Sequence, residues 1–252
     1  MSLDETAVAI TGAGAGMGRA TARLFAERGA SVAAVDVDGG AAGETADLIA
    51  DGGGTAVAIE ADVSDPAAVE GFVEEVVETF GGLDVLHNNA GIPQQSTPVE
   101  EVEEATWDRV LDVNLKSAFL GAKYAVPHLR ESDHEGGGVI INTASTAGIR
   151  PRTGLSAYAA SKGGMITLTK QLAFELADDG VRVNAICPVA TDTDMLPEFA
   201  GGDLTLEGIA DTIPLGRLCE PEDVAEAAVF LAGDGASMIT GTALEVDGGR
   251  DI

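Results

Sequence analysis

The chain has 252 residues, 45% of them hydrophobic, and its 14 Lys and Arg against 42 Asp and Glu give a formal net charge of −28. This length and apolar content argue against a disordered chain and suffice for a buried core. The negative charge argues against binding to nucleic-acid phosphates, and no apolar run reaches the roughly 20 residues that span a bilayer. We therefore expect a folded cytoplasmic protein that contacts neither nucleic acid nor membrane.

The acidic surface also points to the salt conditions in which the protein works. Four of the 14 cations are lysines, namely Lys116, Lys123, Lys162 and Lys170. In molar salt, charges are screened within about 3 Å, so an acidic, lysine-poor surface costs little stability there. We hypothesise a halophilic source, and this hypothesis predicts loss of the fold in dilute buffer.

Short apolar runs alternate with amphipathic helical segments along the whole chain, and no linker or repeat interrupts them. Runs rich in Val, Ile and Ala without strict alternation are typical of strands buried on both faces. The predicted strands are Ala7–Thr11, Ser31–Asp36, Thr55–Glu60, Leu83–Asn88, Val139–Ala144, Val181–Ile186 and Thr242–Val246. This alternation predicts an α/β fold with a doubly wound parallel sheet, in which residues 1–252 form a single Rossmann-like domain.

A glycine-rich turn, Thr11-Gly12-Ala13-Gly14-Ala15-Gly16-Met17-Gly18, joins the first predicted strand to a helix. Such a turn lets the backbone approach a pyrophosphate, which the amides at the helix N-terminus then hold. Asp36 ends the second strand, where a carboxylate can accept hydrogen bonds from an adenosine ribose and repel a 2′-phosphate. The turn and Asp36 together predict NAD, rather than NADP, as the cofactor.

Two further loops follow predicted strands. Asp62 and Val63 come after the third strand, where a side-chain acceptor and an apolar wall can grip an adenine. Asn88-Asn89-Ala90-Gly91 ends and follows the fourth strand, with small residues that let the backbone pass close to a cofactor. Because ligands of open α/β sheets bind at the carboxyl ends of the strands, we expect these loops to converge.

Tyr158 and Lys162 begin a helical stretch, and residues four apart on a helix share a face. An ammonium stabilises a phenolate, so we expect Lys162 to lower the pKa of Tyr158 from its usual value of about 10. Tyr158 can then exchange a proton with an alcohol or ketone while hydride moves. Ser145, which follows the fifth strand, can reach the same substrate oxygen. Asn114 lies in a helical run, where its amide can bend the helix and hold a water for proton relay.

The glycine turn, the segment 88–91, Asn114, Ser145 and the Tyr158/Lys162 pair, in this order and spacing, resemble the short-chain dehydrogenase/reductase family. The resemblance covers nearly the whole chain and implies a seven-stranded sheet and a homotetramer. It also implies that Tyr158 is the general acid/base, that Lys162 lowers its pKa and holds the nicotinamide ribose, that Ser145 orients the substrate oxygen, and that Asn114 supports the relay water.

The cofactor contacts that we expect come from the strand ends and involve no metal. They are Thr11, Gly12, Gly16, Met17, Gly18, Asp36, Asp62, Val63, Asn89, Ala90, Gly91, Tyr158, Lys162, Pro188, Thr191 and Thr193. One position departs from the family, which usually has glycine after Pro188, whereas this chain has Val189. Because valine rarely adopts positive φ, the backbone at 189–191 is expected to differ there.

The substrate side is marked by two features. Residues 194–215 are apolar and flanked by glycine, so they predict either a mobile lid over an apolar pocket or ordinary surface helices. Arg150 and Arg152 lie between Ser145 and Tyr158, and one of them is hypothesised to meet an anionic substrate group, although solvated pairing with the acidic surface is the stronger default.

The cysteines and histidines show no spacing that indicates a disulfide framework or a metal site. Cys187 and Cys219 lie 32 residues apart and are predicted to be free thiols. His87, His128 and His134 are assigned no chemistry.

The function predicted from these residues is an NAD(H)-dependent oxidoreductase that interconverts a secondary alcohol and a ketone. Within the family, a 3-oxoacyl-thioester (carrier-protein or coenzyme A) reductase or 3-hydroxyacyl dehydrogenase competes with a sugar or polyol dehydrogenase, and the resemblance does not choose between them. Asp36 argues against a match to the carrier-protein reductases, which use NADPH. A catalytically silent nucleotide-binding module is the alternative of another class. The intact set of Asn114, Ser145, Tyr158 and Lys162 argues against that module.

Overall fold

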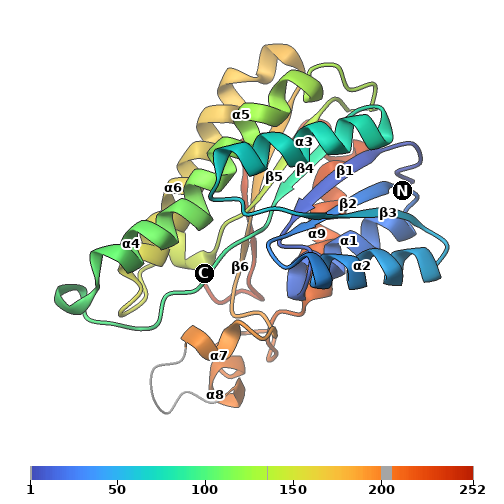
Figure 1. The fold of residues 1–252 in the computed structure, drawn as a ribbon. Coiled ribbons are helices and arrows are strands. Elements are labelled where there is room, and N and C mark those ends of the chain that lie inside the picture. The colour runs from blue at the N-terminus through green and yellow to red at the C-terminus, as the bar shows by residue number, and fades with distance from the viewer. Residues whose placement is uncertain (1, 135, 200–205, 252) are drawn as a thin grey trace.

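The computed structural model describes residues 2–134, 136–199 and 206–251, and its centre is one seven-stranded sheet (Figure 1). The strands are β1 (Ala7–Thr11), β2 (Ser31–Asp36), β3 (Thr55–Glu60), β4 (Val85–Asn88), β5 (Val139–Thr143), β6 (Arg182–Pro188) and β7 (Ala243–Val246). They lie in the order β3-β2-β1-β4-β5-β6-β7, and every pairing is parallel. This arrangement confirms the predicted doubly wound α/β fold.

Helices cover both faces of the sheet (Figure 1). The helices are α1 (Gly16–Glu27), α2 (Gly39–Asp51), α3 (Pro66–Phe80), α4 (Glu104–Leu111), α5 (Ser117–Leu129), α6 (Ser156–Glu175), α7 (Leu196–Phe199), α8 (Leu206–Ala210) and α9 (Pro221–Ala232). Helices α1, α2 and α9 lie together on one face, and α3, α5 and α6 lie on the other. Both faces are therefore buried, as the continuous apolar strands require.

Helix α3 illustrates how the sequence defines an element. Asp65 caps its first turn by accepting a hydrogen bond from the backbone N–H of Ala67 (3.0 Å), and Pro66 fits the first helical position. Gly81 ends the helix with φ +83, in the left-handed region that glycine adopts without strain. These local signals define where the helix begins and ends.

Strand ends differ from the prediction by one or two residues. The strand β6 was predicted to end at Ile186 but continues to Pro188, because Cys187 and Pro188 pair with Glu245 and Val246 of β7. The strand β4 begins at Val85 rather than Leu83. The longer β6 carries the chain further toward the carboxyl edge of the sheet before it turns.

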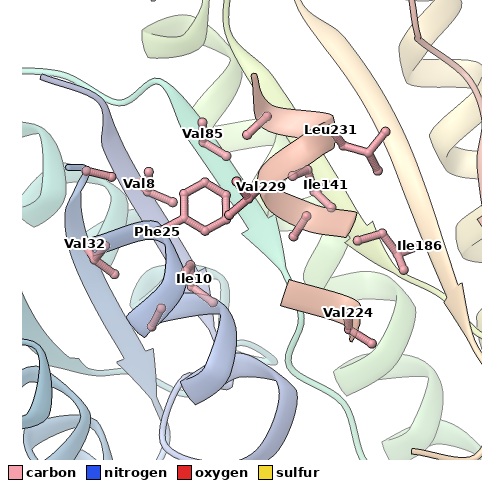
Figure 2. Close-up of a cluster of buried hydrophobic side chains, with 14 of the residues drawn as sticks. Val8, Ile10, Phe25, Val32, Val85, Ile141, Ile186, Val224, Val229 and Leu231 are labelled. Atoms are coloured by element: carbon pink, nitrogen blue, oxygen red, sulfur yellow. The ribbon is translucent and has the colours of Figure 1, made fainter. Parts of the chain in front are cut away.

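The larger hydrophobic cluster lies between the sheet and the layer that contains α1 and α9. Figure 2 shows the ring of Phe25 at its centre, with Val8 of β1 and Val229 of α9 beside it. All three side chains are buried, so α1 and α9 are held against the same part of the sheet. This packing fixes the position of α1, whose N-terminus follows the glycine turn.

The chain reverses its direction of progress across the sheet after β3. It moves outward from β1 to β2 and β3, then returns through α3 to place β4 on the other side of β1. In sheets of this kind, the loops after the two central strands separate and leave a crevice at their carboxyl ends. The glycine turn after β1 and the segment after β4 border that crevice. No helix among the described residues is long and apolar enough to cross a membrane.

The surface charge gives a first testable prediction. The described residues form eight ion pairs, whereas the chain has 42 carboxylates, so most of the negative charge is not offset by a neighbouring cation. Salt screens this repulsion. We expect the melting temperature to rise by at least about 5 °C between dilute buffer and molar KCl, measured by circular dichroism. An unchanged melting temperature would contradict the halophilic hypothesis.

Candidate active site

A cavity of about 1290 Å³ lies along the carboxyl ends of β1 to β6. The predicted site residues that line it are Gly12, Gly16, Met17, Gly18, Asp36, Asp62, Val63, Asn89, Ala90, Gly91, Ser145, Tyr158, Lys162, Pro188, Thr191 and Thr193. The two other predicted site residues, Thr11 and Asn114, are buried behind its wall. The expectation that these loops converge is therefore met.

The glycine turn leaves no room for a side chain at Gly12 or Gly18. Gly12 has φ +65, and a Cβ there would lie 2.8 Å from the Cα of Ala90. A Cβ on Gly18 would overlap the carbonyl oxygen of Gly12. Helix α1 begins next to this turn, and its N-cap residue Ala15 provides no side-chain cap. The turn thus presents backbone to the cavity at a helix N-terminus, which fits a pyrophosphate.

Asp36 lines the cavity and also holds the glycine turn through a hydrogen bond. Its Oδ2 accepts a hydrogen bond from the N–H of Gly14 (2.8 Å), and its Oδ1 accepts one from the N–H of Asp38 (3.0 Å). A carboxylate oxygen can accept more than one hydrogen bond, so both oxygens retain capacity for a ribose hydroxyl. Asp62, which also lines the cavity, accepts hydrogen bonds from Ser64 that lower its pKa and keep it ionised.

Thr11 joins the ends of β1 and β4. Its Oγ1 accepts hydrogen bonds from the N–H groups of Asn89 (3.0 Å) and Ala90 (3.1 Å) and donates to the carbonyl of His87 (3.4 Å). The Asn89 amide donates back to the carbonyls of Thr11 (3.0 Å) and Gly12 (3.3 Å). Thr11 therefore acts on the cavity through the two loops that it ties together.

His87 of β4 extends this network into the core. Thr143 donates from Oγ1 to the Asn89 Oδ1 (3.2 Å), so its oxygen accepts from the Nε2–H of His87 (2.8 Å). The His87 Nδ1 has no hydrogen-bond partner among the described residues. Burial lowers the pKa of His87 to about 3, so the ring is neutral. The His87 side chain therefore supports the end of β5 through its hydrogen bond to Thr143, and it does not act as a charged group.

Ser145, Tyr158 and Lys162 meet at the chemical end of the cavity. Lys162 is buried, and its Nζ donates to the carbonyl of Thr143 (2.7 Å). The same Nζ lies 5.9 Å from the centroid of the Tyr158 ring. Two N–H bonds of the Lys162 ammonium remain for other partners. The Ser145 side chain is within hydrogen-bonding reach of the Tyr158 phenol.

The pKa values at this end differ from the sequence-based expectation. We expected Lys162 to lower the pKa of Tyr158, but burial raises it to about 12, and the Ser145 side chain offsets only part of that rise. Burial also lowers the pKa of Lys162 to about 8. The expectation was wrong because it considered the ammonium alone, whereas removal from water disfavours the charged form of each group. At neutral pH Tyr158 is therefore a protonated phenol.

Asn114 lies within a π-helical turn, Asp112–Lys116, that joins α4 to α5. Its Oδ1 accepts from the N–H of Ile92 (2.7 Å), and its Nδ2 donates to the carbonyl of Ile92 (3.0 Å) and to Ser161 (3.4 Å). The regular α-helical pattern is therefore interrupted at Asn114. The amide holds the segment after β4, and a Cβ on Gly91 would lie 3.3 Å from its Oδ1. A relay water at Asn114 stays a prediction.

The loop after β6 supplies the apolar wall. Val189 does not adopt positive φ, and its N–H donates to the carbonyl of Val246 (3.2 Å), so the chain continues in the direction of β6. Phe199 of α7 packs edge-on against Tyr158, with ring centroids 4.9 Å apart. Met195 and Ile209 also line the cavity. Within the predicted lid, residues 200–205 lie outside the described residues.

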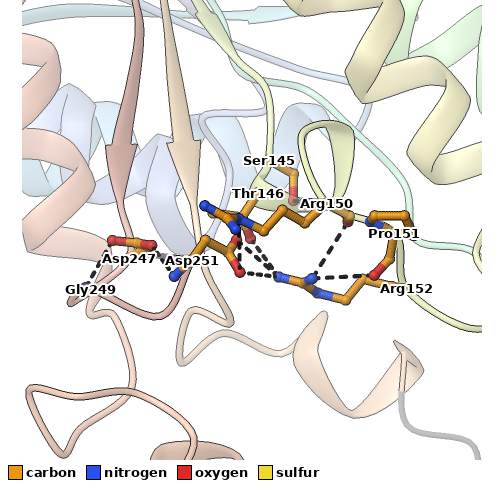
Figure 3. Close-up of polar contacts among 9 residues, drawn as sticks. Ser145, Thr146, Arg150, Pro151, Arg152, Asp247, Gly249 and Asp251 are labelled. Carbon is orange, nitrogen blue, oxygen red and sulfur yellow. Dashed lines mark hydrogen bonds and ion pairs between the residues drawn. The ribbon is translucent and has the colours of Figure 1, made fainter.

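Arg150 and Arg152 both pair with a carboxylate from the end of the chain. Figure 3 shows the Asp251 carboxylate against both guanidinium groups, with Ser145 and Thr146 close by. Arg152 contacts it at 3.0 Å and Arg150 at 3.7 Å. Arg152 lines the cavity and Arg150 does not. Of these two arginines, Arg152 therefore remains the candidate for binding an anionic substrate group.

Three residues at the site were not predicted from the sequence. Gln94 accepts a hydrogen bond from the N–H of Tyr158 (3.0 Å) and is buried. His87 supports Thr143, and Arg250 lines the cavity from the end of the chain. Only His87 could have been noticed in the sequence, because it is a histidine within a predicted buried strand, directly before Asn88. The positions of Gln94 and Arg250 depend on long-range packing that no local pattern shows. The prediction of free cysteines is confirmed for Cys187 and Cys219.

Comparisons with known proteins agree with this geometry. A family model described as enoyl-(acyl carrier protein) reductase matches residues 12–251. The chain is similar to a 4-formylbenzenesulfonate dehydrogenase of Comamonas testosteroni, with 43% identity over all of both chains. It is also similar to a cyclohexanol dehydrogenase of Acinetobacter, with 41% identity over 95% of this chain and 92% of that protein.

Among solved structures, a 3-ketoacyl-(acyl-carrier-protein) reductase from Brucella melitensis, complexed with NADH, superposes with a TM-score of 0.93. It is 44% identical, and the alignment covers all of both chains. The fold, the cavity and these relatives agree on one kind of protein, an oxidoreductase that acts on hydroxyl or keto groups with a nicotinamide cofactor. The chain belongs to the short-chain dehydrogenase/reductase family.

Proposed function

We propose that the chain is an NAD(H)-dependent oxidoreductase that interconverts a secondary alcohol and a ketone, with Tyr158 as its general acid/base. The observation that carries the proposal is the placement of Ser145, Tyr158 and Lys162 in the same cavity as the glycine turn. Bound cofactor supplies or accepts the hydride. The Tyr158 hydroxyl and the Ser145 side chain face the position of the substrate oxygen, and Lys162 has N–H groups free for a nicotinamide ribose.

The protonation state of Tyr158 supports a role for each direction of the reaction. With a raised pKa, the phenol is protonated at neutral pH and can donate its proton to the oxygen of a ketone that is being reduced. In the oxidative direction it must first lose a proton.

Asp36 supports NAD as the cofactor, and its charge can be tested directly. Asp36→Asn keeps the shape and one acceptor oxygen but removes the charge that repels a 2′-phosphate. We expect the ratio of kcat/KM for NADPH to that for NADH to rise at least about tenfold, which corresponds to about 1.4 kcal/mol. Steady-state kinetics with each cofactor measures this ratio.

Asp38→Asn is the matched control for this substitution. Asp38 caps α2, asparagine caps helices equally well, and Asp38 does not line the cavity. We expect its cofactor ratio to equal that of the unchanged protein. An equal ratio in Asp36→Asn as well would contradict the assignment of Asp36 to cofactor choice.

The relatives favour two substrate classes. The 4-formylbenzenesulfonate and cyclohexanol dehydrogenases act on carbonyl or hydroxyl groups attached to six-membered rings, and the apolar wall at Met195, Phe199 and Ile209 suits such a ring. We therefore infer a cyclic or aryl-bearing alcohol as the first substrate class. A 3-oxoacyl thioester is the second candidate, favoured by the Brucella reductase that was complexed with NADH.

A substrate panel in molar KCl tests the function and separates the two classes. Cyclohexanol with NAD and acetoacetyl-CoA with NADH are each followed by the absorbance of NADH. Turnover of one class identifies it. Binding of NADH without turnover of any alcohol, ketone or thioester would contradict the proposal and favour a silent nucleotide-binding module.

A cytoplasmic location and a homotetramer stay predictions. The exposed side chains of Phe119 and Phe174 offer apolar surface for assembly.

A further inference from the structure

The charges that line the cavity are unevenly distributed. The nucleotide end has the acidic residues Asp36, Asp62, Asp108 and Asp112. Arg109 belongs to the same end, since its charge lowers the pKa of Asp62. The chemical end, beside Ser145 and Tyr158, has the cations Arg152, Lys162 and Arg250. In a chain with net charge −28, a group of cations in the substrate region is a specific feature of this cavity.

Contacts connect the two arginines to the reacting groups. The Arg152 Nη2 approaches the Thr146 hydroxyl (3.4 Å), and Thr146 follows Ser145 directly in the chain. Arg250 lies close enough to Arg152 for the charge of Arg152 to lower its pKa. Arg152 therefore lies next to the segment that carries Ser145, and Arg250 lies near Arg152 and lines the same cavity.

The two arginines differ in how their charge is offset. Arg152 makes two hydrogen bonds to the buried carboxylate of Asp251, at 3.0 and 3.1 Å. The side chain of Arg250 has no ion pair or hydrogen bond among the described residues, although it is partly buried. An arginine remains charged at any physiological pH, so its charge requires either water or an anion.

The neighbouring carboxylates that the structure describes leave the Arg250 side chain without a direct partner. Glu245, Asp247 and Asp251 bring one oxygen each within 4.8 Å of one another, but none of the three lines the cavity. Asp251 is shared by Arg150 and Arg152, and Asp247 accepts hydrogen bonds from the backbone N–H groups of Gly249 and Asp251. Arg250 therefore makes no direct ion pair with these carboxylates, although the charge of Asp251 acts on it at longer range.

We propose that Arg250, assisted by Arg152, binds an anionic group of the substrate, so that the enzyme acts on hydroxy or oxo compounds that also bear a carboxylate or sulfonate. The guanidinium plane can donate two parallel hydrogen bonds to such an oxyanion. The apolar wall holds the carbon skeleton between this anion and the reacting carbon. This inference rests on the proposed function and adds a substrate class to it.

The test compares two ligands of equal shape, cyclohexanecarboxylate and the neutral cyclohexanecarboxamide, binding to the enzyme–NADH complex in calorimetry. We expect the carboxylate to bind at least about tenfold more tightly than the amide, since charge-assisted hydrogen bonds are stronger than neutral ones. Arg250→Gln should abolish this difference, and Arg250→Lys should restore part of it. Because the Arg250 side chain has no described partner, we expect both variants to fold.

Arg23→Gln is the matched control, because Arg23 is exposed on α1, makes a weak 4.0 Å contact with Glu27 and does not line the cavity. It should leave the preference for the carboxylate unchanged. Equal affinity for the two ligands in the unchanged protein, or a preference that persists in Arg250→Gln, would overturn the proposal. A changed molecular mass of Arg250→Gln in light scattering would assign Arg250 to a subunit contact and would also overturn it.

These outcomes are separate from those of the proposed function. Turnover of cyclohexanol without any preference for the carboxylate would uphold the alcohol dehydrogenase and reject the anion subsite. A preference for the carboxylate that depends on Arg250, in a protein that turns over no alcohol or ketone, would uphold the subsite and reject the reaction.

Discussion

Tyr158→Phe is expected to lower kcat by about 10²- to 10⁴-fold, the range attributed to a positioned general acid/base. The substitution removes one hydroxyl and keeps the ring, which packs edge-on against Phe199. The fold and the apolar wall should therefore persist. We expect the affinity for NADH, measured by fluorescence titration, to fall far less than kcat, because the other predicted cofactor contacts remain in place.

The chain provides a matched control, since Tyr124 is its only other tyrosine. Tyr124 lies on α5, accepts a hydrogen bond from the Nζ of Lys123 (3.2 Å) and does not line the cavity. Tyr124→Phe removes the same atom at a distance from the site and should leave kcat unchanged. Equal activity of Tyr158→Phe and Tyr124→Phe would show that the proton is transferred by another group.

The predictable parts of this protein are those defined by local sequence. Strand–helix alternation was sufficient for the order and direction of the elements, and the glycine turn, Asp36 and Tyr158 were identified at the ends of the elements that carry them. Parallel strands bring their carboxyl ends to one edge. The predicted site residues from Gly12 to Thr193 that line the cavity could therefore be assigned to one site from the sequence alone.

The parts that were not predictable depend on burial and on residues distant in sequence. The pKa of Tyr158 follows from the removal of water around the phenol, and sequence spacing contains no measure of that removal. Arg250 reaches the cavity because the end of the chain returns to Arg152 through Asp251. His87 supports Thr143 across neighbouring strands, and only their register places them together.

Gly18→Ala tests the cofactor cradle with the smallest side chain that can be added. Its Cβ would overlap the carbonyl oxygen of Gly12 and lie 2.7 Å from the Nδ2 of Asn89. Backbone cannot rotate away as a side-chain end can, so the turn must open. Overpacking of this kind costs about 1–3 kcal/mol. If the strain distorts the turn, NADH affinity falls by about 10- to 100-fold, which fluorescence titration measures.

Gly71→Ala adds the same methyl group where no atom opposes it. Gly71 is exposed within α3, and a Cβ there would meet nothing within 4 Å. Alanine is the better helix former by about 1 kcal/mol, so this variant should be more stable in urea and bind NADH normally. The two substitutions are chemically identical, so opposite effects on stability must come from their surroundings. Normal NADH binding by Gly18→Ala would place the cofactor away from the glycine turn and contradict the assignment of the cavity.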